Sequence, residues 1–147
     1  MDLSDIYTDV INEYSRSQKH RQSLKHPSIS TRGINPSCGD DISLELEVQN
    51  DIIVNVGILG NGCAISEASA AIMADLINGK TTAEASELAK LFIGMIRKEV
   101  TDEQTLEKIE DGIALQNISN MPARVKCAVL AWRTLEDALQ KLPSTKA

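Results

Sequence analysis

The sequence predicts an α+β fold: an N-terminal helix, a small three-stranded antiparallel sheet, then four or so helices packed on one face. Two observations support this prediction. Strand-like patterns are confined to residues 28–59, whereas helical periodicity governs residues 66–142. The chain has 147 residues, which is the length of one domain, so we expect a single domain over 1–147. Residues 1–3 and 143–147 are expected to fray.

The first expected element is an amphipathic helix over residues 4–17, with Ser4 or Asp5 as its N-cap. Residues 16–26 follow, with four Lys or Arg residues and no acid before Pro27. This composition predicts an exposed loop. Such a run is usually only solvated, and the alternative is a docking surface for an acidic partner.

The sheet is expected to have a hairpin at its centre. Residues 42–48 alternate apolar and polar side chains without a fault, which predicts a half-buried antiparallel strand. After a polar turn, residues 52–59 are rich in β-branched side chains and form its partner. A shorter third strand is expected at 28–34. The inward-facing residues of the second hairpin strand are expected to be Val54, Val56 and Ile58.

The pattern becomes helical at Ser66, and the Asn78-Gly79 pair is a C-terminal stop signal for that helix. Thr81 and Glu84 have the spacing of a capping box. We therefore expect a second helix to begin directly after the first one ends.

Two further helices are expected after that. A shorter one near 102–111 starts with Thr101 and Gln104, again at capping-box spacing. Pro122 opens the last helix at its first position, and the apolar stripe of this helix ends at Pro143.

Composition excludes several classes of function. Only 3% of residues are aromatic and the net charge is −6, so a nucleic-acid surface of stacking rings and basic side chains is not expected. No run approaches the roughly 18 apolar residues of a membrane span. The N-terminal residues also lack the pattern of a signal peptide, so we expect a cytoplasmic protein, with a monomer as the default.

The three cysteines carry most of the functional information. They stand in the motifs NPSCGD (Cys38), GNGCAIS (Cys63) and PARVKCA (Cys127). Their number is odd and their separations are 25 and 64 residues, so a common metal site has to be assembled by the fold rather than by one loop. Asp40 offers a fourth ligand, although an aspartate at this position can also simply cap a turn.

The expected surroundings of the thiols differ. Cys38 lies on a tight loop, where a thiol can act as both ligand and nucleophile. Cys63 precedes a helix, whose N-terminus favours the thiolate. Cys127 lies in the second turn of the last helix, and its alternative is a packed small hydrophobic residue. Arg124 can assist the site or be a solvated charge, and neither His20 nor His26 has the spacing of a ligand.

Together the three cysteine motifs resemble the IscU/SufU/NifU N-terminal family of iron–sulfur cluster assembly proteins over nearly the whole chain. The chain is most similar to the SufU branch, because the stretch between Cys63 and Cys127 is long and Lys126 precedes Cys127. The IscU scaffolds have a histidine in place of Lys126.

The resemblance implies a zinc site made of Cys38, Asp40, Cys63 and Cys127. It implies that Cys38 accepts persulfide sulfur from a pyridoxal-phosphate cysteine desulfurase of the SufS type and passes it to downstream iron–sulfur assembly proteins, with Arg124 in support. One alternative is a scaffold on which the same ligands assemble a [2Fe–2S] cluster. The other alternative is a non-catalytic interaction domain that uses zinc only for stability.

Overall fold

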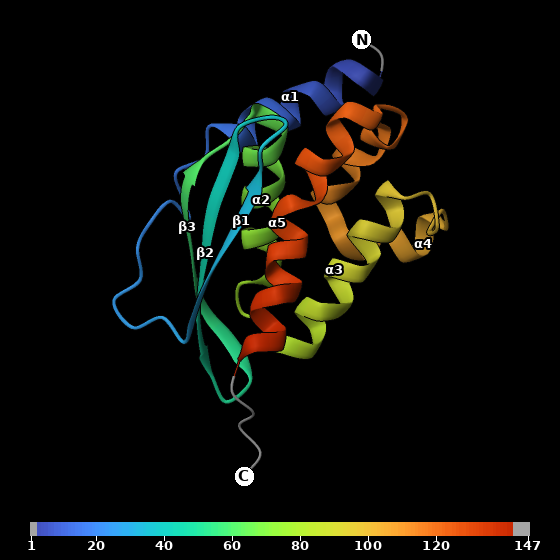
Figure 1. Cartoon of the computed structure of the whole chain (residues 1–147). Coiled ribbons are helices and arrows are strands. Elements are labelled where there is room, and N and C mark those ends of the chain that lie inside the picture. The colour runs from blue at the N-terminus through green and yellow to red at the C-terminus, as the bar shows by residue number, and fades with distance from the viewer. Residues whose placement is uncertain (1–2, 143–147) are drawn as a thin grey trace.

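The computed structural model of the protein describes residues 3–142, with side chains from residue 8 onward. A three-stranded sheet lies on one side of the molecule and the helices lie on the other (Figure 1). This arrangement confirms the predicted α+β fold. The expected fraying of 1–3 and 143–147 lies outside the described residues, except at Leu3, where α1 begins. The elements in order are α1 Leu3–Ser15, β1 Ile29–Asn35, β2 Asp40–Gln49, β3 Ile52–Asn61, α2 Ala64–Ile77, α3 Thr82–Ile96, α4 Glu103–Leu106, the 3-10 helix η1 Glu107–Asn120 and α5 Pro122–Lys141.

The sheet has the strand order β1-β2-β3, and both pairs are antiparallel. Alternation along β2 is as predicted, since Ile42, Leu44 and Leu46 are at most 2% exposed. The alternation continues back to the first residue of the strand, so Asp40 also points into the protein and is 1% exposed. A carboxylate therefore lies at the end of a row of core side chains.

The predicted register of β3 is wrong at Val54. Glu47 pairs with Asn55 and Val48 pairs with Ile53, so Val54 is an extra residue that opposes no residue of β2. This β-bulge reverses which side chains face inward at the start of the strand. Ile53 is fully buried, whereas Val54 is 37% exposed.

Helices α2 and α5 pack against the inner face of the sheet, and α3 packs on α5 (Figure 1). Gly33 of β1 allows α5 to approach closely, because a Cβ atom there would lie only 2.1 Å from Thr134 Oγ1. In the core the ring of Trp132 stacks on Phe92 with centroids 4.6 Å apart. The sheet and α5 therefore form one rigid support for residues at their ends.

The predicted end of α2 at the Asn78 C-cap and the predicted start of α3 at the Thr81–Glu84 capping box are confirmed, whereas α2 begins at Ala64, two residues before the expected Ser66. The predicted start of the next helix is wrong. Its N-cap is Asp102, whose side chain accepts a hydrogen bond from the Thr105 N–H. The carboxylate of Asp102 therefore satisfies the helix N-terminus that Thr101 was expected to cap.

The expected helix near 102–111 is also shorter than predicted. The α-helical turn α4 ends at Leu106, and the chain continues as the 3-10 helix η1. Glu110 interrupts η1 with φ 46° and ψ −119°, a conformation that side chains rarely adopt. The segment therefore kinks instead of continuing as one helix.

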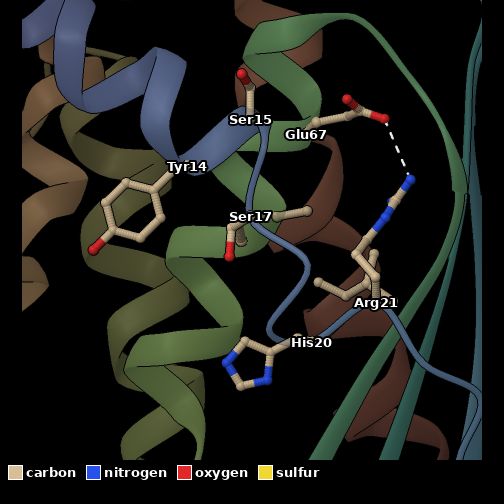
Figure 2. Close-up of a pocket in the computed structure, with 9 residues that line it drawn as sticks. Tyr14, Ser15, Ser17, His20, Arg21 and Glu67 are labelled. Carbon is tan, nitrogen blue, oxygen red and sulfur yellow. Dashed lines mark hydrogen bonds and ion pairs between the residues drawn. The ribbon is translucent and has the colours of Figure 1, made fainter.

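The basic loop 16–26 is mostly exposed, as predicted, but it is anchored at its middle. His20 is 8% exposed, lies 2.8 Å from Asp75 of α2, and accepts a hydrogen bond from Ile58 N–H through its carbonyl. Arg21 is paired with Glu67 of α2, and the two side chains face each other in Figure 2. The loop therefore covers the free edge of β3, and part of its positive charge is neutralised within the protein.

Within residues 3–142, no helix combines the length and apolar character needed to cross a membrane.

Candidate metal centre

The fold brings the cysteine motifs together at one end of the sheet. Cys38 lies in the turn between β1 and β2, Cys63 is the N-cap of α2, and Cys127 lies in the second turn of α5. The Sγ atoms of Cys38 and Cys127 are 2.9 Å apart. The possible ligand atoms of Cys38, Asp40 and Cys127 all lie within 4.8 Å of one another. The predicted meeting of distant segments is thus present in the structure.

Asp40 is held as a buried carboxylate. Its Oδ1 accepts a 2.8 Å hydrogen bond from the Cys63 N–H, and its Oδ2 accepts a 3.1 Å hydrogen bond from Asn35 Nδ2. Burial alone would raise the pKa of Asp40, but these bonds, together with the nearby Ser66 hydroxyl and Cys127, hold the pKa below its usual value. Asp40 therefore stays negatively charged beside the thiols. Its neighbour Asp41 instead pairs with Arg32 on the outer face of the sheet.

Cys63 stands at the margin of this group. Its Sγ accepts a 3.5 Å hydrogen bond from the Ser66 N–H at the start of α2, as the prediction of a thiol at a helix N-terminus requires. Its thiol lies outside the tight group of three, yet it is close enough to raise the pKa of Cys127. Gly62 permits the turn, because a Cβ atom there would lie 2.9 Å from Asp40 Oδ1.

Cys127 and Arg124 form the α5 side of the centre. Cys127 is fully buried, and burial, followed by the Cys38 and Cys63 thiols, raises its pKa. The pKa of Arg124 is raised by a hydrogen bond to Cys127 and by electrostatic interactions with Cys63, Cys38 and Cys127. Arg124 lines the same groove as Cys38, and Cys127 is both packed in the core and part of the cluster.

An open groove of about 460 Å³ adjoins the centre on its solvent side. Its lining includes Cys38, which is half-buried, and the exposed residues Arg124 and Lys126. His20 takes no part in the centre, since it pairs with Asp75 near the C-terminal end of α2, whereas Cys63 is the N-cap of that helix. A partner can therefore reach Cys38 from the groove, whereas Cys127 lies behind it.

The residues present fit a sulfur-preferring metal ion. Thiolates and a carboxylate are ligands of both zinc and iron, and a divalent cation would neutralise negative groups that otherwise repel one another. The raised pKa of Cys127 reflects that mutual repulsion in part. The donor set alone does not select between the two metals.

Sequence reasoning missed two polar residues at the centre, Asn35 and Ser66. Asn35 is the cross-strand partner of Asp40 and is 5% exposed, and Ser66 is 1% exposed. Each had a detectable signal: Asn35 is the first residue of the NPSCGD motif, directly after the expected strand 28–34, and Ser66 lies three residues after Cys63, at the spacing of an N-cap contact.

A three-stranded antiparallel sheet, a helical layer on one face and a thiol–carboxylate cluster at one end together define a metal-binding α+β domain. Residues 6–147 match the NifU-like N terminal domain, and the chain belongs to this family. The resemblance predicted from the cysteine motifs is thereby confirmed.

Relatives and solved structures agree with this assignment. The chain is 38% identical to the iron–sulfur cluster assembly scaffold protein IscU of Thermotoga maritima, over 93% of this chain and 94% of that one. It is also 38% identical to the zinc-dependent sulfurtransferase SufU of Bacillus subtilis, over 95% of this chain and 92% of that one. The crystal structure of FiSufU from Fervidobacterium islandicum, described as an iron–sulfur cluster assembly scaffold protein for the SUF system, superposes with a TM-score of 0.83 at 38% identity, covering 94% of this chain and 99% of that one.

Proposed function

We propose that this protein acts in iron–sulfur cluster assembly as a zinc-bound sulfur acceptor, which takes persulfide sulfur from a cysteine desulfurase and passes it on. The observation that carries the proposal is the tight group of Cys38, Asp40 and Cys127, in which Cys38 alone lines the open groove. The similarity to the Bacillus subtilis zinc-dependent sulfurtransferase supports it.

In this proposal Cys38, Asp40, Cys63 and Cys127 hold the zinc ion. Zinc keeps thiolates deprotonated while it lowers their reactivity, and it takes no part in electron transfer. Asp40 contributes a carboxylate that is already charged, because its pKa lies below the usual value. Arg124 places a positive charge where a sulfur anion on Cys38 would form.

The transfer step is thiol–disulfide exchange chemistry. The Cys38 thiolate attacks the outer sulfur of the desulfurase persulfide, a new S–S bond forms at Cys38, and the desulfurase cysteine leaves as a thiolate. The sulfur–sulfur bond is exchanged rather than reduced, so no external oxidant or reductant is needed. Cys38 is suited to this role because it lies at the groove, whereas Cys127 is fully buried.

The second candidate function is a scaffold on which a [2Fe–2S] cluster, here the cargo, is assembled by the same residues. The equally high identity to the Thermotoga maritima scaffold protein favours it. The residue before Cys127 favours sulfur transfer instead: Lys126 is exposed and cationic, and its ammonium group cannot serve as the histidine ligand expected in a scaffold.

The test measures cysteine desulfurase turnover with and without this protein, together with its zinc content. We expect zinc near one equivalent, clear stimulation of turnover, and sulfur label on Cys38. Cys38→Ser should abolish both stimulation and labelling, whereas Ser37→Ala, a change in the same turn, should retain them.

Three other results would decide against the proposal. A Cys38→Ser variant that still accepts labelled sulfur excludes Cys38 as the acceptor. Anaerobic reconstitution of a stoichiometric cluster that moves intact to an apo-protein supports the scaffold. Zinc binding without any stimulation of the desulfurase supports a purely structural zinc domain.

A further inference from the structure

Some residues of the metal centre accept hydrogen bonds from neighbouring side chains and others do not. Asn35 donates two of these bonds, one to Asp40 and one to Cys127. Its side-chain Nδ2 lies 3.1 Å from Asp40 Oδ2 and 3.6 Å from Cys127 Sγ. An amide nitrogen carries two N–H groups, so one Asn35 side chain can donate to both residues at once. Because Asn35 is 5% exposed at the end of β1, this nitrogen occupies a fixed position.

Ser66 supplies the matching contacts from α2. Its backbone N–H donates to Cys63 Sγ at 3.5 Å, and its hydroxyl donates to the Cys127 carbonyl at 3.1 Å. Ser66 thereby connects the first turn of α2 to the α5 backbone at the residue that carries the buried thiol. Through the Cys63 N–H, which donates to Asp40, the contacts of Ser66 and Asn35 form one connected frame.

Cys38 lies outside this frame. Within residues 3–142 its Sγ has one hydrogen-bond contact, and that contact is with Cys127 rather than with a supporting residue. Its backbone N–H makes only the 3.3 Å turn contact to the Asn35 carbonyl. Next to it Gly39 has φ 71° with no atom near its Cβ position, so the turn has open space on that side.

We propose that Asn35 and Ser66 are positioning residues that hold Asp40, Cys63 and Cys127 in a fixed arrangement, and that Cys38 lacks this support. This inference rests on the ligand set of the proposed function. Groups that hydrogen-bond to metal ligands fix their orientation, and losing one such group typically lowers metal affinity about 10- to 100-fold. Three of the four proposed ligands have this support, and Cys38 does not.

The test compares two variants with a matched control. Asn35→Ser shortens the side chain that reaches Asp40 and Cys127, and Ser66→Ala removes the hydroxyl that holds the Cys127 carbonyl. The control is Ser69→Ala, because Ser69 is equally buried on α2 and donates to the Ala128 carbonyl at 2.6 Å, one residue beyond Cys127. Ser69→Ala therefore removes a similar contact without touching a ligand, and it also removes the acceptor of the 3.1 Å hydrogen bond from Trp132 Nε1–H.

The main readout is iodoacetamide modification of each cysteine in the zinc-loaded protein, mapped by mass spectrometry over time. In the wild type we expect Cys38 to be modified first, with Cys63 and Cys127 protected. In Asn35→Ser and Ser66→Ala, modification of Cys127 should be about tenfold faster or more, and zinc release to a chelator should be faster by about 10- to 100-fold. Ser69→Ala should lower the unfolding midpoint but keep the wild-type order of modification.

Two outcomes overturn the inference alone. In the first, all three cysteines of the zinc-loaded wild type react with iodoacetamide at similar rates. In the second, Asn35→Ser and Ser66→Ala keep both the wild-type order of cysteine modification and the wild-type rate of zinc release. Wild type that binds no zinc overturns both the inference and the ligand set on which it rests. A zinc-loaded wild type that fails to stimulate a desulfurase overturns only the proposed function, because the order of modification is read without any partner.

Discussion

Adding one methyl group at Gly62 should weaken the metal centre without unfolding the protein. The φ of Gly62 is not among the positive values in the described chain, so its backbone can accept alanine. The new Cβ atom would lie 2.9 Å from Asp40 Oδ1 and 3.0 Å from Ser66 Cβ. Ordinary contacts of this kind begin near 3.4 Å, so the Asp40 carboxylate has to move by several tenths of an ångström.

The size of the effect follows from what holds that carboxylate. Asp40 Oδ1 accepts a 2.8 Å hydrogen bond from the Cys63 N–H, and the displacement has to lengthen it. A hydrogen bond to a charged group contributes about 1.5–3 kcal/mol. If the zinc-bound protein loses this contribution, its affinity for zinc falls by about 10- to 100-fold.

The assay is competition for zinc with a chromogenic chelator, accompanied by urea unfolding of the metal-free protein. Asn61→Ala is the control, because Asn61 is exposed in the same turn and its truncation creates no close contact. A Gly62→Ala protein that binds zinc within about twofold of the wild type would refute the reasoning, and it would remove Asp40 in its present position from the ligand set.

Three further changes test other parts of the fold. The Tyr14 hydroxyl donates to Asp111 at 2.6 Å, and burial and then this bond raise the pKa of Tyr14, so the bond stabilises the fold below about pH 10 and this stabilisation is lost as pH rises further. Tyr14→Phe should lower the free energy of unfolding in urea by about 1 kcal/mol at pH 7, and between pH 7 and about pH 10.5 the variant should lose less stability than the wild type. Glu110→Gly should raise the thermal midpoint, since φ 46° with ψ −119° favours glycine by about 1 kcal/mol, and a lower midpoint would contradict this account of the kink. Thr31 Oγ1 is buried with no partner in the described chain, so Thr31→Val should leave unfolding free energy unchanged or raise it by up to about 1 kcal/mol, and a loss larger than that would mean that the hydroxyl is satisfied.

Sequence alone was sufficient where one local pattern had one solution. The alternation over residues 42–48 specified the buried face of β2, and continuing it backward would also have placed Asp40 inside. The same method failed at the start of β3, because Ile52, Ile53 and Val54 are all apolar and β-branched and alternation cannot choose among them. The β-bulge opposite Glu47 and Val48 determines which of these side chains faces inward, and no local sequence pattern marks this bulge.

For the candidate site too, some features could be predicted from the sequence and others could not. The cysteine motifs identified the elements that carry each thiol, because glycine turns and helix starts are local features. Asn35 and Ser66 had local signals, but their contacts could not be predicted, because Asn35 reaches Asp40 only through the β1–β2 register and Cys127 only through the docking of α5. Contacts of this kind depend on tertiary distances that residue spacing does not encode.

The position of Cys127 affects when this centre can first exist during protein synthesis. Its thiol contacts Cys38 across 89 residues of chain, and it belongs to the last helix of the fold. A nascent chain in which β1, β2, β3 and α2 have already formed therefore still lacks one of the proposed ligands, and it lacks the helix that buries the centre. The complete set of proposed ligands therefore first exists after α5 has docked, and not while the sheet is being translated.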